Sequence, residues 1–532
     1  MKIREFSWAN YRRLPDGILT VRNHLVLVGP NDSGKSSIVR ALHLCLGMAH
    51  GQLTAAVTPR DFTDPALPLT ITVILDGIDA NDRAAFPDEI TTGPPEALVV
   101  VVEATMDPAD PEQKVVRRFF PDAGHNKAPT KDQLAMIAFQ FVPAARSLLR
   151  ELGGASGGAV RSLLSGLDLT ADAASLGAAA DAYREALDDS QTLKDFRGEL
   201  ASALTDALPV PVPEADVRVV SEAEILSDPL SGVTVTVDDG GHSVPLSEQS
   251  DGIRALSVLA LLGMSHKTAR IVAVDEPETH LHPSAQRSIA KSLRSGIGQR
   301  ILVTHSPSIA GQMDPMDIAT VRADKHVRQL PPGADIAQHD KTIRHWSDRL
   351  IEPLTARRVV LVEGASDQIL FERAAELTGV NLDRKGVAVF DLGGAGLFGL
   401  AYTVFGPQGF DIPLNGLVDE DARQKWASAV GVAPAGLEAA GYPVCNPDLE
   451  GTYIDTLGVA VVIPMLVASP SIGQNMLLKS CGAATVASIT RDQLWDFCKG
   501  RKVVAAIAVA DALTPAQAVS ITPINDLLQL VK

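Results

Sequence analysis

Two apolar segments in the last third of the chain end in closely spaced carboxylates. The stretch VVLVEGASDQIL places Glu363 directly after four aliphatic residues and Asp367 four positions later. The stretch DIPLNGLVDEDA contains Asp419 and Asp421, and two residues with this spacing point to the same side of an extended chain. A further acid, Glu450, ends the stretch NPDLE. Oxygen ligands without a nearby histidine or cysteine suit Mg²⁺ or Mn²⁺ better than zinc, so the pattern predicts a divalent-metal site.

The first of these segments also has a simpler interpretation. Ser366 fits the N-cap of a helix, and Asp367 fits a first-turn acid that complements the helix dipole. Two acidic strand ends within one βαβ segment favour the metal site over this alternative.

A phosphate-binding loop is predicted near the N-terminus. The stretch GPNDSGKSS has the spacing G-x-x-x-x-G-K-S, directly after an apolar strand and before a helix. Glycines let backbone amides turn toward a phosphate, the lysine reaches the β- and γ-oxygens, and the serine ligates Mg²⁺. The pattern predicts binding of ATP or GTP. The residues assigned to the nucleotide are Gly29, Asn31, Gly34, Lys35, Ser36 and Ser37, and Ser36 is also assigned to the magnesium ion.

The stretch RIVAVDEPETHLHP supplies the second half of this nucleotide site. Asp275 ends an aliphatic strand and is expected to hold the magnesium shell, while Glu276 follows in a position to polarise water. The apolar strand of ILVTHSP ends at His305, which reaches a γ-phosphate if its strand neighbours that of Asp275. The alternatives are two surface acids after a core strand and a structural histidine.

The stretch LSEQSDGIRALSVLALL opens a predicted helix with Ser250 and Gly252, whose exposed amides could meet phosphate. It resembles the signature segment of ABC-type ATPases, and the motif order matches that class. Arg254 stands near where many members carry glutamine, which is similar to the divergent, DNA-maintenance branch. The resemblance implies a dimer, because the signature of one subunit completes the ATP site of another. Taken alone, Ser250 also fits an ordinary N-cap, and no Q-loop is assigned.

The elements around these motifs divide the chain into three predicted regions. Residues 1–345 are expected to form the ATPase domain, 346–354 a linker, and 355–532 a domain with βαβ texture to its end. Within the first, 143–208 is rich in alanine and leucine and predicts a helical insertion that packs in the core or pairs with a second subunit. The stretch GVTVTVDDGGHSVPL predicts a β-hairpin. The apolar stripe of the insertion consists of Leu193, Phe196, Leu200 and Leu204.

The composition is that of an ordinary soluble globular protein. The chain has 532 residues, of which 46% are hydrophobic and 21% charged. No charged-then-apolar leader and no run of 18 apolar residues is found, so neither secretion nor a membrane span is expected, and a cytoplasmic location fits. The four cysteines are scattered, which predicts neither a disulfide framework nor a zinc site. The net charge of −17 opposes non-specific adhesion to nucleic acid but is compatible with a metal-bridged contact.

The acids of the last third carry a resemblance to a known fold. Glu363-Gly364 followed by Asp419-x-Asp421 resembles the Toprim pattern, a metal-binding α/β fold of topoisomerases, primases and some nucleases. A Toprim domain that follows an ABC-type ATPase is similar to the OLD (overcoming lysogenization defect) family, which includes the nuclease subunit of the Gabija anti-phage system. The implied fold class is α/β: an N-terminal ABC-type P-loop ATPase with a helical insertion, and a C-terminal Toprim domain.

The resemblance also implies roles for individual residues. OLD-type Toprim domains resemble two-metal nucleases in which a late lysine assists the scissile phosphate. The stretch CKGRKVVAAIAV offers Lys499 or Lys502; Lys502 is favoured because it abuts the β-like apolar run, and a solvated basic turn is the alternative. The residues in the positions of the metal-binding acids are Glu363, Asp367, Asp419, Asp421 and Glu450.

The implied activity is an ATP-regulated DNA endonuclease that depends on Mg²⁺ or Mn²⁺ and acts in anti-phage defence or DNA repair. The implied partners are DNA, further copies of the chain in a homodimer or higher homo-oligomer, and a helicase. Two other functions remain: a RecF-like ATP-dependent DNA clamp or sensor without cleavage, and an RNA-processing nuclease. The set of five carboxylates argues against the clamp. Whether ATP activates or inhibits cleavage does not follow from the sequence.

Overall fold

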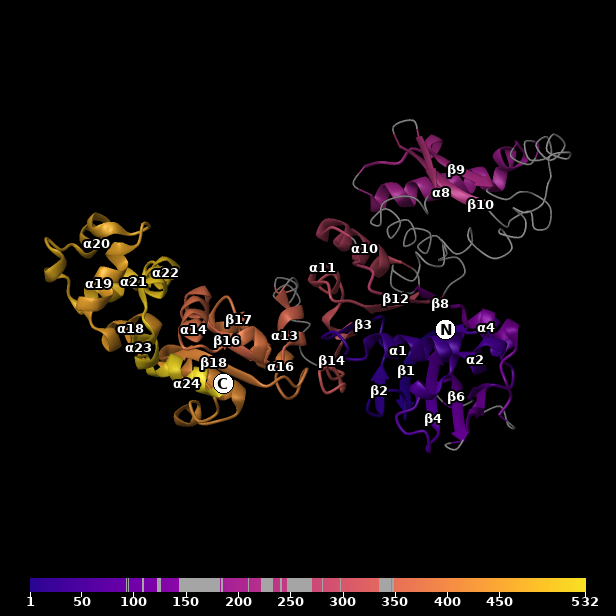
Figure 1. Cartoon of the computed structure of the whole chain (residues 1–532), viewed down its shortest axis with the longest axis horizontal. Coiled ribbons are helices and arrows are strands. Elements are labelled where there is room, and N and C mark those ends of the chain that lie inside the picture. Colours follow the sequence, from indigo (N-terminus) through magenta and orange to yellow (C-terminus); the bar gives the residue numbers. More distant parts are fainter. Residues whose placement is uncertain are drawn as a thin grey trace. The chain divides into compact units, whose positions relative to one another are not determined.

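The computed structural model divides into two compact units, one formed by Met1–Val327 and the other by Arg349–Lys532, with the residues between shared out among them (Figure 1). The residues that the structure describes are 1–142 except 92, 94, 108–109 and 122–125, then 182, 185–208, 210–221, 233–239, 242–245, 270–333 except 280 and 297, 346, and 349–532.

The first unit contains a largely parallel sheet that carries the nucleotide motifs. Its strands, in spatial order, are β15 (Val327–Gln329), β14 (Ile318–Val321), β3 (Leu25–Val28), β13 (Gln299–Val303), β12 (Ile271–Asp275) and β8 (Phe139–Val142). The five strands from β14 to β8 run parallel. Strand β13 therefore lies between the strand that precedes the P-loop and the strand that ends in Asp275. Parallel strands present their carboxyl ends at one edge, so this order brings the three nucleotide motifs together.

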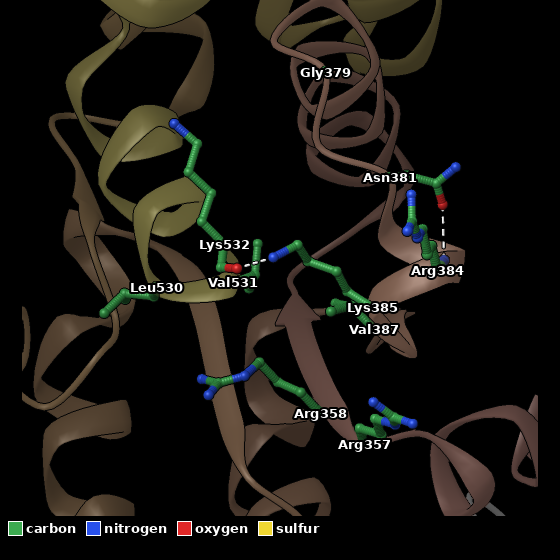
Figure 2. Close-up of a pocket in the computed structure, with 10 residues that line it drawn as sticks. All are labelled: Arg357, Arg358, Gly379, Asn381, Arg384, Lys385, Val387, Leu530, Val531 and Lys532. Atoms are coloured by element: carbon green, nitrogen blue, oxygen red, sulfur yellow. Dashed lines mark hydrogen bonds between the residues drawn. The ribbon is translucent and has the colours of Figure 1, made fainter.

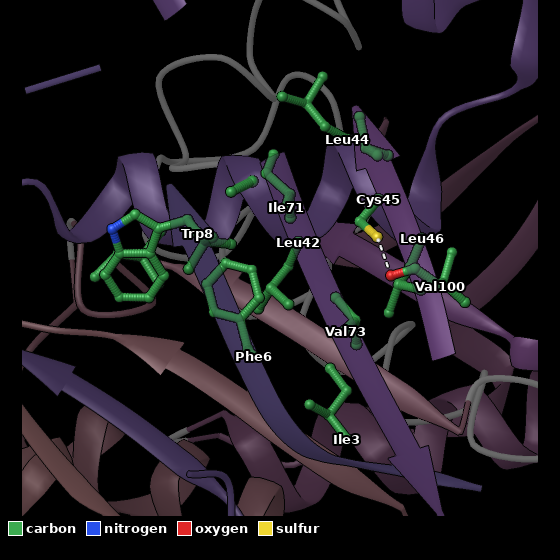
Figure 3. Close-up of a cluster of buried hydrophobic side chains, with 14 of the residues drawn as sticks. Ile3, Phe6, Trp8, Leu42, Leu44, Cys45, Leu46, Ile71, Val73 and Val100 are labelled. Carbon is green, nitrogen blue, oxygen red and sulfur yellow. Dashed lines mark hydrogen bonds between the residues drawn. The ribbon is translucent and has the colours of Figure 1, made fainter. Parts of the chain in front are cut away.

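An antiparallel sheet packs against the same core from the other side of helix α1 (Lys35–Leu42). Its strands are β1 (Lys2–Ala9), β2 (Gly17–Thr20), β4 (Leu69–Asp76), β5 (Ile90–Thr91), β6 (Ala97–Asp107) and β7 (Asp110–Phe119). Figure 3 shows Phe6 and Ile71 of this sheet pointing toward Leu42, and the same cluster includes Leu27 and Ile301 of the parallel sheet. Burying each such side chain contributes about 1.5–3 kcal/mol, so the P-loop helix is fixed between two sheets.

Other helices of the first unit are α2 (His50–Ala56), α3 (Ala80–Ala85), α4 (Lys131–Ile137), α8 (Gln191–Ala207), α10 (Pro283–Ser295) and α11 (Pro307–Ala310). The predicted helical insertion lies largely outside the described residues. In its described part, Leu200 and Leu204 of α8 are buried against Val217, so these two members of the stripe pack within the chain. The predicted hairpin is confirmed: β10 (Val233–Asp239) pairs antiparallel with β11 (His242–Pro245) and, on its other side, with β9 (Val217–Ser221).

The second unit is built on a four-stranded parallel sheet. Its strands, in spatial order, are β17 (Val387–Asp391), β16 (Arg358–Val362), β18 (Leu414–Asp419) and β19 (Val444–Cys445). Its helices up to β19 are α13 (Ile351–Thr355), α14 (Ala365–Leu377), α15 (Leu382–Lys385), α16 (Phe398–Phe405) and α17 (Arg423–Val430). Helix α13 begins inside the segment predicted as a linker.

The expectation of βαβ texture to the end of the chain is wrong. After β19 the second unit contains helices only: α18 (Leu449–Leu457), α19 (Val459–Ala468), α20 (Gly473–Cys481), α21 (Arg491–Lys499), α22 (Lys502–Ala512), α23 (Pro515–Ser520) and α24 (Thr522–Val531). The run after Lys502, expected to be β-like, is helix α22. Its alanines favour a helix, and the small buried Ala505 and Ala508 let α22 pack closely on α14.

No single helix among the described residues is long and apolar enough to cross a membrane. The pair Leu449–Leu457 and Val459–Ala468 meets the length and composition criteria together, but it is bent by 112°. Buried residues of both helices belong to the core of the second unit.

Candidate functional site

The P-loop connects β3 to α1 through two glycines with positive φ angles. Gly29 has φ 156° and Gly34 has φ 108°. A Cβ atom at Gly29 would lie 2.2 Å from the backbone oxygen of Val321, so only glycine fits there. The ammonium of Lys35 donates to the backbone oxygens of Gly29 at 3.0 Å and of Pro30 at 2.8 Å, so it lies folded into the loop.

The residues of this loop fit a bound phosphate. Burial lowers the pKa of Lys35 to about 8, against the opposing effect of Glu276 and Asp275, which indicates a cation with too little nearby negative charge. The hydroxyl of Ser33 is buried without a hydrogen-bond partner among the described residues. Asn31 is exposed, and the Ser37 hydroxyl accepts a hydrogen bond from Arg12 at 3.1 Å.

The predicted magnesium residues of the ATPase unit lie together. The hydroxyl of Ser36 donates to Asp275 Oδ1 at 3.4 Å, across 239 positions of sequence. Burial raises the pKa of Asp275, and the Ser36 hydrogen bond opposes that shift. Glu276 follows with φ 49°, and its backbone N–H donates to the oxygen of Val303 at 2.9 Å, which ties it to the end of β13.

His305 follows β13, and β13 pairs with β12, the strand that ends in Asp275. The predicted role of His305 required this pairing. Sequence reasoning missed the residue that holds this segment. The carboxylate of Glu278 accepts the backbone N–H of His305 at 2.5 Å and the hydroxyl of Thr304 at 2.8 Å. Burial raises the pKa of Glu278 and lowers that of His305. The only signal in the sequence was a further acid in the run DEPETH. Ser250 and Gly252, assigned to the nucleotide, lie outside the described residues.

Three of the predicted metal-binding acids converge at the carboxyl edge of the second sheet. One carboxylate oxygen each of Glu363, Asp419 and Asp421 lies within 4.8 Å of the other two. Glu363 follows β16, and its Oε1 accepts the backbone N–H of Asp419, the last residue of β18, at 3.1 Å. The chain at Asp421 is not extended as predicted, because residues 420–422 form a 3₁₀ turn. That turn nevertheless keeps the Asp421 carboxylate beside the other two.

The other two predicted ligands flank this cluster on helices. Asp367 lies in the first turn of α14, where its carboxylate accepts the N–H of Gly364 at 2.8 Å, as the simpler interpretation expected. Its assignment of Ser366 to the N-cap is wrong, because the helix begins at Ala365 and its N-cap is Gly364. Glu450 lies in the first turn of α18, and its Oε2 is buried without a hydrogen-bond partner among the described residues.

The electrostatics of the acid cluster indicate an excess of negative charge. Burial, followed by repulsion from Glu363 and Asp367, raises the pKa of Asp419 to about 8. Burial, followed by repulsion from Glu363 and Glu450, raises the pKa of Asp367 to about 7 despite its bond to Gly364. Burial also raises the pKa values of Glu363 and Glu450. Clustered carboxylate oxygens with one orphaned buried member are a donor set that fits Mg²⁺ or Mn²⁺.

The two candidate lysines lie in different surroundings. The ammonium of Lys502, at the start of α22, lies 3.6 Å from Glu450 Oε2 and 3.8 Å from Asp419 Oδ2. Burial alone would lower the pKa of Lys502, but Glu450 and Asp419 together raise it. The ammonium of Lys499 instead lies 3.5 Å from Asp448 and 4.8 Å from the centre of the Trp495 ring.

Asp448 and Trp495 form a support for the Glu450 helix that the sequence did not reveal. The carboxylate of Asp448 caps α18 by accepting the N–H of Gly451 at 2.7 Å. The indole N–H of Trp495 donates to the same carboxylate at 2.8 Å, so α21 fixes the end of the helix that carries Glu450. The two residues lie 47 positions apart, and no spacing rule connects them.

Two family models match separate parts of the chain. Residues 144–310 match an AAA domain whose description names the AbiEii toxin of a Type IV TA system. Residues 354–421 match the TOPRIM domain of proteins like the overcoming lysogenization defect protein. The second match covers the strand ends that carry Glu363 and Asp419.

Two named relatives are each 24% identical to this chain. An OLD nuclease of Thermus scotoductus (strain ATCC 700910 / SA-01) aligns over 450 residues, 79% of this chain and 82% of the relative. Endonuclease GajA of Bacillus cereus (strain VD045) aligns over 222 residues, 40% of this chain and 38% of that protein.

Solved structures resemble parts of the chain at low TM-scores. The C-terminal region of the Burkholderia pseudomallei OLD protein is 20% identical, with a TM-score of 0.26 over 33% of this chain and 96% of that structure. An Smc head domain derived from Pyrococcus furiosus is 14% identical, with a TM-score of 0.38 over 64% of this chain and 99% of that structure. The match to the AAA domain precedes the match to the TOPRIM domain along the chain. The chain has a mixed α/β fold in which an AAA-type N-terminal domain precedes a C-terminal Toprim domain, and it is similar to OLD-family proteins.

Proposed function

We propose that the chain is an ATP-regulated, divalent-metal-dependent DNA endonuclease. The observation that carries this proposal is the convergence of Glu363, Asp419 and Asp421 within 4.8 Å at the carboxyl edge of the Toprim sheet. The names of the OLD nuclease and the GajA endonuclease support it. A role in phage defence or DNA repair is part of the same proposal and rests on the resemblance.

The proposed metal-binding residues are Glu363, Asp367, Asp419, Asp421 and Glu450. Divalent cations bound there would supply Lewis-acid polarisation of a phosphodiester and a water molecule of lowered pKa. The protein groups contribute orientation and charge. The Asp419 N–H holds the Glu363 carboxylate in place, and the Gly364 N–H holds Asp367. The ammonium of Lys502 adds a positive charge beside Asp419 and Glu450, where it can bind a non-bridging oxygen of the scissile phosphate.

The proposed nucleotide site uses the P-loop residues with Ser36 and Asp275 for the magnesium ion. ATP bound there would offer its phosphates to the loop amides and to the ammonium of Lys35. Glu276 and His305 follow the ends of neighbouring strands and are proposed to orient the attacking water and sense the γ-phosphate. Ser250 and Gly252 of a second copy would complete the site in a homodimer, and closure of that dimer would regulate the Toprim unit. We further propose domain limits of 1–345 and 355–532 around a linker at 346–354.

A plasmid assay tests the proposal directly. Supercoiled DNA and RNA are incubated with purified protein and Mg²⁺ or Mn²⁺, with and without ATP, beside Asp419→Ala and Lys35→Ala. We expect cutting of DNA that Asp419→Ala abolishes, whereas Lys35→Ala changes only its dependence on ATP. If the Asp419 variant nicks DNA as well as the parent, the site is not the nuclease. If RNA alone is cut, the substrate assignment is wrong.

A further inference from the structure

A basic pocket lies on the Toprim unit, at the opposite end of its strands from the acid cluster. A cavity of about 670 Å³ is lined by residues from the starts of β16 and β17, from α15, and from the end of α24. Five of the ten lining residues are cations and none is an acid, in a chain whose net charge is −17. The cations are Arg357, Arg358, Arg384, Lys385 and Lys532.

The arginines of this basic pocket are held in place by the backbone. The N–H groups of Arg357 and Arg358 both donate to the oxygen of Gly386, at 2.8 and 3.3 Å. Gly386 has φ 67°, and the aliphatic stem of Arg357 packs over it so closely that an added Cβ would lie 3.1 Å away. The guanidinium of Arg358 donates to the side chain of Asn415, which is buried and donates in turn to the backbone of Gly441 at 3.1 Å. The Arg358 side chain is therefore fixed, and the backbone that carries Arg357 is anchored to Gly386.

Two cations of the pocket, Arg357 and Arg384, form no ion pair within the described part of the chain. Neither guanidinium lies within 4.0 Å of an Asp or Glu side chain of the described residues, and both side chains are exposed. Figure 2 shows Lys385 extending across the pocket to the backbone oxygen of Lys532, while Arg384 lies on the α15 side. Cations spread over several elements suit a ligand that presents several phosphates in a row better than one compact anion.

The distance to the acid cluster suits the same ligand. Strand β16 begins at Arg358 and ends beside Glu363, a separation of roughly 16 Å at the usual rise per residue. A DNA strand advances about 3.4 Å per nucleotide along the duplex axis, so roughly five base pairs span the interval. We infer that the basic pocket binds the phosphodiester backbone of DNA that flanks the cleavage site. This inference takes its ligand from the proposed function.

The binding test uses Asp419→Ala full-length protein, so that labelled duplex DNA is not cut. Arg357→Gln combined with Arg384→Gln should weaken binding roughly 10- to 100-fold near physiological salt and reduce the slope of log K against log salt by about 2. The matched control combines Lys291→Gln with Lys479→Gln, two exposed lysines outside the pocket, and should change affinity less than about threefold. Equal effects of the two pairs, or no effect of the arginine pair, would overturn the inference.

Two further measurements distinguish this DNA contact from the endonuclease proposal and from binding of a small phosphorylated ligand. In cleavage-competent protein the arginine pair should raise KM for DNA about tenfold and leave kcat within about twofold. If the parent does not cut but the arginine pair still weakens binding, the endonuclease proposal fails and the DNA contact stands. Inorganic pyrophosphate is also titrated into Lys35→Ala protein by calorimetry. If the arginine pair abolishes pyrophosphate binding while DNA affinity is unchanged, the pocket serves a small phosphorylated ligand and the inference is wrong.

Discussion

The two candidate metal sites of this chain differ in how many ligands the protein itself supplies. Among the described residues of the ATPase site, the hydroxyl of Ser36 and the carboxylate of Asp275 face each other at 3.4 Å. At the Toprim site three carboxylates lie within 4.8 Å, and the buried Glu450 lies close to the lysine that contacts Asp419. We therefore expect the phosphates of a bound nucleotide to complete the first site, whereas the second site already holds several clustered carboxylates. A metal ion should enter the first only with nucleotide and the second without it.

The lysines of the two sites differ in the same way. Within the described residues, the Lys35 ammonium bonds to backbone oxygens alone, and burial lowers its pKa to about 8, so a bound phosphate would favour its charged form. Lys502 lies beside Asp419 and Glu450, whose combined charge raises its pKa. Lys35 therefore lacks, in the part of the chain that the structure describes, an anionic partner that a ligand could supply, whereas Lys502 partly neutralises acids of the protein itself.

The largest effect that would sharpen this comparison is expected at Lys502. Lys502→Ala removes the cation beside Asp419 and Glu450 and should lower the rate of DNA cutting about 100- to 1,000-fold, as loss of one preorganised charge does in other active sites. Single-turnover cleavage measures the rate. Lys499→Ala is the matched control, because its ammonium contacts Asp448 instead, and it should retain at least about a third of the rate. A larger loss for Lys499→Ala than for Lys502→Ala would reverse the assignment.

A smaller effect is expected at Glu278 in the ATPase unit. Glu278→Ala leaves the N–H of His305 and the Thr304 hydroxyl without their acceptor, which costs about 1–3 kcal/mol and frees the His305 segment. ATP hydrolysis should fall roughly 10-fold, while metal-dependent DNA cutting without nucleotide stays within about twofold. Glu278→Gln retains an acceptor and should recover most of the hydrolysis. Full ATPase activity in Glu278→Ala would show that the hydrogen bonds of Glu278 to His305 and Thr304 do not position His305.

The smallest effect concerns the stability of the metal-free protein. Because the pKa of Asp419 is raised to about 8, this carboxyl group binds its proton more tightly in the folded protein than in the unfolded chain. The stability from this group is present at low pH and is lost as the pH rises through about 8. In the presence of a chelator, the contribution of Asp419 to the thermal midpoint should fall between about pH 4 and pH 8, and Asp419→Asn should reduce that fall.

Differential scanning calorimetry measures this midpoint, with Asp383→Asn as the control because Asp383 is exposed on α15. A fall of the same size in the parent and in Asp419→Asn would remove Asp419 as its cause.

Sequence patterns predicted which side chains lie close together where a residue's position follows from a strand end. Asp275, Glu363 and Asp419 end strands or follow them directly, and parallel pairing then brings such residues to one edge regardless of their separation in the chain. The same reasoning failed for Asp421, which lies in a 3₁₀ turn, because local backbone geometry after a strand is not fixed by alternation.

Other features depended on tertiary packing. The run after Lys502 combines valine with alanine and is ambiguous between strand and helix, and burial of its alanines against α14 decides for the helix. The choice between Lys499 and Lys502 follows from where that helix begins. The Asp448–Trp495 support joins two helices, and no pattern within either one predicts it.

The most direct test measures Mn²⁺ binding to the full chain without nucleotide. Electron paramagnetic resonance quantifies the free ion at each concentration of protein. The parent and Asp275→Asn should bind Mn²⁺ alike, and Asp419→Asn should bind at least about tenfold more weakly. Undiminished binding by Asp419→Asn, or loss of binding in Asp275→Asn, would contradict the claim that the Toprim carboxylates form a metal site without help from a ligand.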